Sequence, residues 1–95
     1  MDKDSFRDAA NKTLMKVTVL FFANLKTIAD KDRFSITIPL QTCIRDLKPL
    51  IVMEIPELED GLSTALAAIN RNFAGDDDEI PADAEVAFFP PMRGG

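Results

Sequence analysis

The chain has 95 residues, of which 46% are hydrophobic and 28% charged, and its formal net charge is −5 at neutral pH. This is the size of one small domain with a single core, and its acidic balance disfavours nucleic-acid binding, which depends on cations that neutralise phosphates. There is no His, Trp or Tyr and only one cysteine, Cys43, so a nucleophile–histidine pair and an internal disulfide are excluded; we expect a non-catalytic protein of the reducing cytoplasm.

The first 14 residues are polar and charged, with Phe6 and Leu14 as their only large apolar side chains. They are expected to form a flexible N-terminal extension, although Ser5 could cap a short helix, and the domain proper is expected over residues 15–95. Residues 16–22 alternate at first and then become apolar throughout, which predicts a strand whose far end is covered on both faces.

A short helix is expected over residues 23–30, with Asn24 as its cap. The alternating residues 34–38 predict a half-buried second strand that closes at Pro39. The two strands would form a hairpin joined by a loop with a helical turn.

The main helix is expected over residues 42–58, where apolar side chains recur at steps of three and four. Its stripe comprises Ile44, Leu47, Ile51, Ile55 and Leu58. Pro49 allows two interpretations: a helix that begins at Thr42 is kinked by it, whereas a helix capped by Asp46 holds it harmlessly in the first turn. Pro56 is expected to end the helix, and Gly61 to mark the following turn.

Residues 64–69 are alanine-rich, which favours a helix, but the Asn70–Asn72 segment after them is typical of a hairpin turn. We therefore predict a strand at 64–69 and a short return strand at 72–74. The acidic residues 75–79 lack the spacing of a calcium loop, and Cys43 has neither a histidine nor a second cysteine to share a metal, so a solvated loop and no metal site are expected. Residues 85–89 form the last strand.

Apart from the short helix and the short return strand, the order of two strands, one main helix and two strands predicts an α+β domain. A β-grasp roll, with a mixed sheet of four to five strands packed on one main helix, is the simplest fold of this order.

The C-terminal tail, residues 90–95, is the most informative segment. Pro90 and Pro91 cannot continue a central strand, and Gly94 and Gly95 carry no side chain, so the tail should protrude from the fold and fit a narrow channel. A frayed terminus or a cloning remnant would also end in glycines. The direct passage from an apolar strand into the prolines favours a functional tail.

The segment Glu85–Pro91 followed by Gly94 and Gly95 resembles the C-terminus of the MoaD-type small subunit of molybdopterin synthase, of the ubiquitin-like superfamily that includes ThiS. Residues 17–23 resemble that family's first strand, and residues 67–70 its hairpin. The resemblance covers residues 15–95 in element order. Met92 and Arg93 depart from it, because small, β-branched or hydroxyl residues are more usual there.

The resemblance implies a sulfur carrier that is not an enzyme by itself but belongs to a sulfurtransferase. The Gly95 carboxylate would be adenylated with ATP by a MoeB-type, E1-like activating enzyme and converted to a thiocarboxylate, with Gly94 giving access to the reacting group. These modifications are transient, and no bound cofactor is implied. A MoaE-type large subunit would use the sulfur to build the molybdopterin dithiolene within a heterotetramer.

A docking surface is expected at the exit of the tail. On the first strand Val17, Val19 and Phe21 share one face, which leaves Phe22 on the other, and on the last strand Phe89 lies opposite the core face. If the two strands are neighbours, as in a β-grasp sheet, Phe22 and Phe89 form an aromatic patch, which is exposed unless a loop or the N-terminal extension covers it. Exposed aromatic patches mark partner sites. The partner-binding residues predicted from the sequence are Phe22, Phe89, Pro90, Pro91, Met92 and Arg93.

Other functions need the same tail. A ubiquitin-like modifier would join Gly95 to lysines of target proteins, and a carrier could supply sulfur for tRNA thiolation, thiamine or cysteine. A plain interaction domain would have an inert tail. No segment is long enough to cross a membrane, so a membrane is not expected as a partner. The acidic net charge likewise makes a nucleic acid an unexpected partner.

Overall fold

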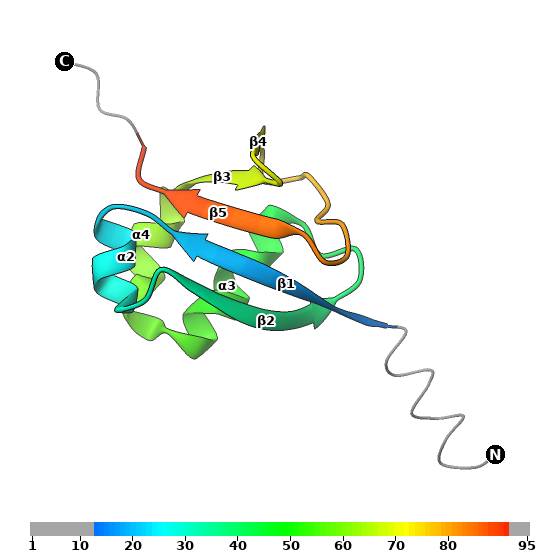
Figure 1. Ribbon diagram of the computed structural model, residues 1–95, viewed down its shortest axis with the longest axis horizontal. Coiled ribbons are helices and arrows are strands. Elements are labelled where there is room, and N and C mark those ends of the chain that lie inside the picture. Colours follow the sequence, from blue (N-terminus) through cyan, green and yellow to red (C-terminus); the bar gives the residue numbers. More distant parts are fainter. Residues whose placement is uncertain (1–12, 92–95) are drawn as a thin grey trace, which may run out of the picture.

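The computed structural model describes residues 13–91, which form one mixed five-stranded sheet with helices on one of its faces (Figure 1). The elements in chain order are β1 (Leu14–Phe21), α2 (Asn24–Ala29), β2 (Arg33–Pro39), α3 (Ile44–Glu54), the 3-10 helix η1 (Pro56–Leu58), α4 (Glu59–Ser63), β3 (Leu66–Ile69), β4 (Asn72–Ala74) and β5 (Glu85–Phe89). The strand order is β2-β1-β5-β3-β4, and only β1 and β5 are parallel. This confirms the predicted α+β class and the β-grasp arrangement.

The core lies between the sheet and α3, and its composition follows from the period of each element. Strand residues at every second position face the helices, and the apolar stripe of α3 faces the sheet. The predicted core face is confirmed for Val17, Val19, Phe21, Val86, Phe88, Ile44, Leu47 and Ile51, which are all buried. Of the other two residues of the predicted helix stripe, Leu58 is buried in η1 and Ile55 is half-buried just after the end of α3. Burial of each large apolar side chain contributes about 1.5–3 kcal/mol, so this layer holds the two central strands in place.

The first strand and the first helix differ in detail from expectation. β1 begins at Leu14, one residue inside the predicted extension, and ends at Phe21, so Phe22 lies beyond it. Asn24 is the first residue of α2 and not its cap; the cap position is Ala23, which makes no side-chain capping bond. The chain is turned into α2 by the backbone of Ala23 and not by a capping side chain.

The main helix is shorter than predicted, because it ends at Glu54 and gives way to η1 and α4. Its N-cap is Cys43, so Pro49 is an interior residue, and the interpretation with Asp46 as the cap is wrong. Gly61 lies within α4 and not in a turn. Within the described part of the chain, none of the helices has the length and apolar character required to cross a membrane.

The β3–β4 hairpin confirms the strand prediction for the alanine-rich segment, although the strand begins at Leu66. Its two-residue turn, Asn70 and Arg71, has φ angles of 48° and 73°. Both residues in the left-handed region characterise the tight turn that matches the twist of paired strands. β3 pairs with β5 on its other side, so the hairpin extends the sheet beside the strand that carries the tail.

Candidate functional site: the root of the tail and the exit patch

The root of the tail is held where β5 ends beside the start of α2. The amide of Phe22 donates a hydrogen bond to the carbonyl of Phe88 at 3.2 Å, which continues the β1–β5 pairing past the end of β1. Pro90 and Pro91 follow at once, and neither can donate to a neighbouring strand. They line a depression of about 330 Å³ together with Ala23, Asn24, Leu25, Gly61 and Thr64. The last strand and the α2–α4 side of the fold therefore fix where the tail begins.

Ala23, in this depression, has a strained backbone. Its φ of 55° and ψ of −133° belong to a region that glycine occupies freely and alanine does not. Strain of this kind costs about 1–3 kcal/mol and tends to be kept at functional sites. The sharp turn places Phe22 and α2 against the root of the tail.

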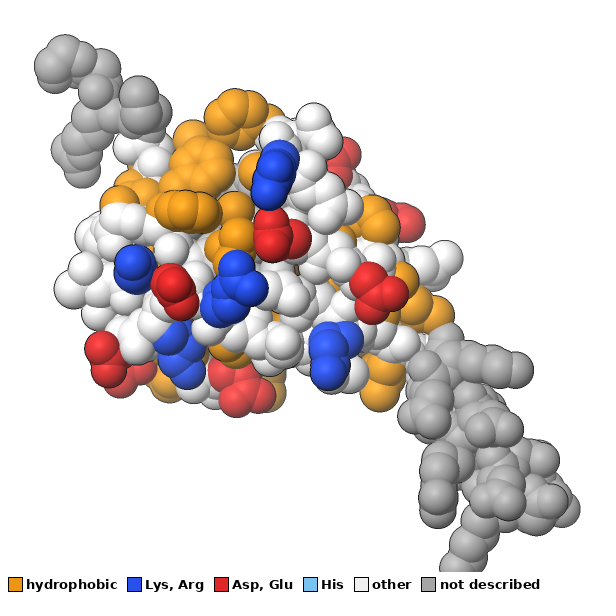
Figure 2. Space-filling view, in the orientation of Figure 1, with side chains coloured by type: hydrophobic (Ala, Val, Ile, Leu, Met, Phe, Trp, Pro, Cys, Tyr) orange, Lys and Arg blue, Asp and Glu red, His pale blue; other side chains and the backbone are white. Residues whose placement is uncertain are grey.

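The open face of the sheet carries a continuous apolar surface beside the tail. We call it the exit patch and define it as Leu20, Phe22, Leu66, Ala68, Phe73, Ala87 and Phe89. The strand register builds it, because Leu20 lies opposite Ala87, Ala87 and Phe73 lie opposite Ala68, and Leu66 lies opposite Phe89. Figure 2 shows hydrophobic side chains gathered on this face, next to the end of the described chain.

Two aromatic rings form the prominent part of the exit patch. The ring centroids of Phe73 and Phe89 are 5.7 Å apart and the rings meet edge to face. β4 and β5 lie on either side of β3, about 9–10 Å apart by ordinary strand spacing, so the rings lean toward each other over β3. The small side chain of Ala68 leaves room for this. Phe73 is 80% exposed, an unusual position for a large aromatic side chain unless a partner covers it.

The residues predicted from the sequence are brought together at this site as far as the structure describes them. Phe22 is 48% exposed, Phe89 is half-buried, and Pro90 and Pro91 continue from β5. Phe73 was not predicted, because its place beside Phe89 depends on the pairing of β3 with both neighbours. Two further patch residues, Leu66 and Ala68, were missed for the same reason.

The rest of the predicted site, namely Met92, Arg93, Gly94 and Gly95, lies outside the described residues.

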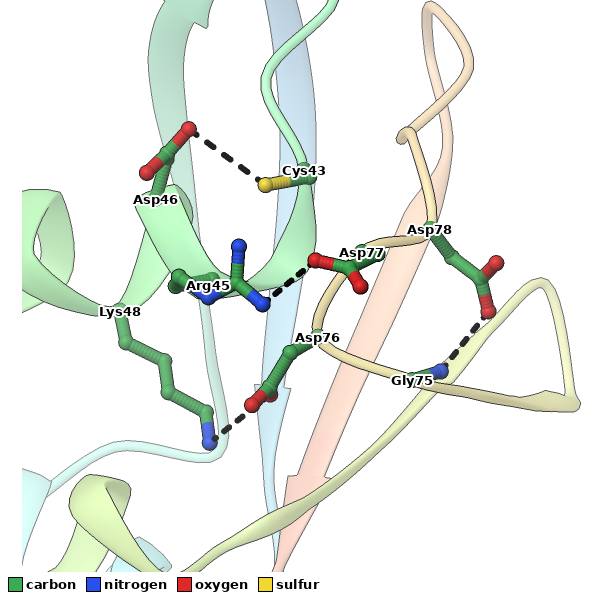
Figure 3. A network of polar contacts seen from close by, with 8 residues as sticks. All are labelled: Cys43, Arg45, Asp46, Lys48, Gly75, Asp76, Asp77 and Asp78. Carbon is green, nitrogen blue, oxygen red and sulfur yellow. Dashed lines mark hydrogen bonds and ion pairs between the residues drawn. The ribbon is translucent and has the colours of Figure 1, made fainter.

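The acidic loop before β5 is attached to the start of α3 (Figure 3). Asp77 forms an ion pair with Arg45 and raises the pKa of that guanidinium, and Asp76 lies 3.8 Å from the Lys48 ammonium. Asp78 accepts a hydrogen bond of 2.8 Å from the Gly75 amide. Within residues 13–91 no group of three or more acidic or cysteine side chains has metal-binding geometry. The loop precedes β5 and the tail follows it, so these contacts support the end of the strand away from the tail.

Comparison with known proteins gives a consistent family. The sequence model of the ThiS family matches residues 19–95. The molybdopterin synthase sulfur carrier subunit of Dictyostelium discoideum is 31% identical over 84 residues, which cover 81% of this chain and 93% of that protein. The putative molybdopterin converting factor subunit 1 of Pyrococcus furiosus has a TM-score of 0.72 and 26% identity, covering 82% of this chain and 99% of that one.

Two further solved structures share the fold. The H. volcanii small archaeal modifier protein 1 has a TM-score of 0.72 at 21% identity and covers 82% of this chain and 99% of that one. A chain in the complex of subunits 1 and 2 of molybdopterin-converting factor from Helicobacter pylori 26695 has a TM-score of 0.60 at 22% identity. The match covers 85% of this chain and 100% of that one. At these identities the likeness shows the fold alone.

Proposed function

Because the chain belongs to the ThiS family, we propose that it is a sulfur carrier, the small subunit of a molybdopterin synthase. The name of its Dictyostelium relative supports this function. The observation that carries the proposal is the direct passage of β5 into Pro90 and Pro91 beside the exit patch, with Gly94 and Gly95 following shortly after in the sequence.

The proposed chemistry takes place at the Gly95 carboxylate. A carboxylate is a poor electrophile, so one of its oxygens first attacks the α-phosphate of ATP, pyrophosphate leaves, and an acyl-adenylate forms. A reduced sulfur donor at the oxidation level of sulfide then attacks the acyl carbon and displaces AMP, which leaves a thiocarboxylate. Neither glycine has a side chain, so the group can enter a closed active site where it is held close to its reactant.

Two partners follow from this chemistry. An E1-like activating enzyme of the MoeB type would bind ATP, and a large synthase subunit of the MoaE type would receive the sulfur. The Helicobacter pylori complex of subunits 1 and 2 supports the second partner. The exit patch suits both, because each must take up the tail, and an apolar surface next to the tail stabilises that alignment.

The proposal is tested by intact-mass spectrometry. The purified carrier is incubated with its activating enzyme, ATP and inorganic sulfide, and the expected result is a mass gain equal to one oxygen exchanged for one sulfur. Omission of ATP, or deletion of Gly95, should remove the shift. An unchanged mass, with an activating enzyme that modifies its own known carrier in parallel, would contradict the proposal.

A ubiquitin-like modifier is the second candidate function, because the H. volcanii small archaeal modifier protein 1 shares the fold. The two functions differ in the acceptor of the activated tail. A modifier would yield covalent adducts of high mass on lysines of other proteins, whereas a carrier retains the thiocarboxylate on the free chain. Gel electrophoresis of the same reaction with cell extract added distinguishes them.

A further inference from the structure

We infer that Asn70 is a positioning residue for partner docking: it fixes the β3–β4 hairpin to the start of β5 and thereby sets Phe73 against Phe89. This inference rests on the proposed function, because docking of the large subunit is the event that it serves. Asn70 lies outside the exit patch and is not expected to touch the partner.

The side chain of Asn70 substitutes for its own backbone carbonyl in the β3–β5 ladder. The last register pair is Ile69 with Val86, and the next would be Asn70 with Glu85. The Asn70 amide does donate to the Glu85 carbonyl at 2.8 Å. The return bond, at 3.0 Å, runs from the Glu85 amide to the side-chain Oδ1 of Asn70.

The turn conformation is the reason why the side chain of Asn70, and not its backbone carbonyl, accepts the bond from Glu85. Asn70 has a φ of 48°, in the left-handed region, and its carbonyl accepts a bond of 3.2 Å from the side chain of Asn72 instead of facing β5. Few residue types combine a tolerance for this conformation with a short side-chain acceptor. Asparagine meets both needs, so the hairpin turns sharply without releasing β5.

Apart from the link at Asn70, few described contacts fix the position of β4 relative to β5. It has three residues and pairs within the described sheet with β3 alone, at its edge. Phe73 lies at the middle of β4 and reaches Phe89 across β3. Loss of the link at Asn70 would let the hairpin twist relative to β5, and the edge-to-face contact would become intermittent.

The test compares Asn70→Gly with Asn70→Asp in the full chain. Glycine accepts the turn conformation but offers no side-chain acceptor, whereas aspartate keeps an oxygen for the Glu85 amide. Affinity for the purified large synthase subunit is measured by titration calorimetry. Since one hydrogen bond is at stake, Asn70→Gly should weaken binding about three- to tenfold, and Asn70→Asp should restore it to within about twofold.

Two controls separate positioning from a general loss of stability. Ser63→Ala removes an exposed hydrogen bond to the Asp60 carbonyl in α4, which precedes the end of β3 opposite to the turn. Asn72→Ala removes the bond within the turn but leaves both bonds to Glu85. Both variants should bind as the unaltered chain does. Equal weakening in Asn70→Gly and Ser63→Ala would overturn the inference, as would normal binding of Asn70→Gly.

A second readout does not depend on the partner. In NMR spectra of the free carrier, nuclear Overhauser contacts between the Phe73 and Phe89 rings should weaken in Asn70→Gly and persist in Asn70→Asp. Unchanged contacts in Asn70→Gly would overturn the inference. If the unaltered chain does not bind the large subunit, the proposed docking is wrong, and the ring contacts still decide whether Asn70 positions Phe73.

Discussion

Phe73 and Met53 offer a matched pair at the scale of single residues. Both are large apolar side chains, 80% and 79% exposed, but Phe73 belongs to the exit patch and Met53 lies on α3. Phe73→Asp should weaken binding of the large subunit by more than about 2 kcal/mol, because exposed aromatic side chains at interfaces are frequent hot spots. Met53→Asp should leave binding unchanged. Calorimetric titration measures both.

The thermal stability of these two variants completes the comparison, since neither side chain belongs to the core. Both should melt within a few degrees of the unaltered chain. A large drop in melting temperature for Phe73→Asp, with normal affinity, would show that Phe73 supports the hairpin and not the partner.

Ala23 is the second residue whose replacement gives a clear expectation. Its φ of 55° with ψ of −133° is unfavourable for any residue with a Cβ. Ala23→Gly should relieve this backbone strain and thereby raise the free energy of unfolding by about 1 kcal/mol. The net gain is smaller, because glycine also gives the unfolded chain more conformational entropy. Denaturant unfolding measures it, and a loss of stability would indicate that the methyl group packs in the depression at the root of the tail.

At the scale of elements, α3 contains a defect that substitution can remove. Pro49 is the sixth residue of the helix and has no amide hydrogen to donate to the carbonyl of Arg45. The ring is exposed to solvent, so its loss leaves no cavity in the core. Pro49→Ala should stabilise the domain by about 1–2 kcal/mol, or a rise in melting temperature of roughly 4–16 °C for a domain of this size.

Val52→Ala, three residues further along the same helix, serves as the control for Pro49→Ala, because it shortens a half-buried side chain without changing a backbone hydrogen bond. It should lower the melting temperature slightly. If Pro49→Ala were also destabilising, the ring would have a packing role in the groove that it shares with Leu62.

The elements that the sequence predicted well are those with a simple period. β2, β5 and the core face of β1 follow from alternation, and the buried stripe of α3 follows from steps of three and four. Gly61 was misinterpreted because glycine usually marks a turn. In the structure an added Cβ at Gly61 would lie 2.6 Å from Leu25 Cδ2, so glycine is there for the contact of α4 with α2. Such a contact has no local signal in the sequence.

The residues of the candidate site also divide into those with a local sequence pattern and those without one. Phe22 and Phe89 could be assigned to one face by alternation along their own strands. Phe73 could not be assigned to the site in this way, because it lies beside Phe89 only as a result of two strand pairings, β3 with β4 and β3 with β5. A residue that reaches the site through the pairing of strands distant in the sequence can be identified only when the order and register of the whole sheet are known.

At the scale of the whole molecule, the acidic balance predicts how fast partners are found. A net charge of −5 favours encounter with basic partner surfaces. The association rate with the large subunit should therefore fall as salt is raised from about 10 mM to 150 mM, where screening shortens to about 8 Å. The dissociation rate should change little, because the exit patch is apolar. Stopped-flow kinetics measures both, and a salt-independent association rate would contradict electrostatic steering.

The last prediction concerns the separation of folding from chemistry along the chain. Within residues 13–91 the described strands and helices form one hydrophobic core together with α3, and a residue added after Gly95 is four or more positions away from them in the sequence. One alanine added after Gly95 moves the carboxylate by one residue and puts a methyl group beside it, so it should no longer fit an active site shaped for glycine. The melting temperature should stay the same, while the gain of sulfur measured by intact mass and the synthesis of molybdopterin should both be lost.

The matched control adds an alanine before Met1, which should leave stability and both activities intact. An extended carrier that is shown by mass to be untrimmed, yet still acquires sulfur, would rule out the Gly95 carboxylate as the reacting group.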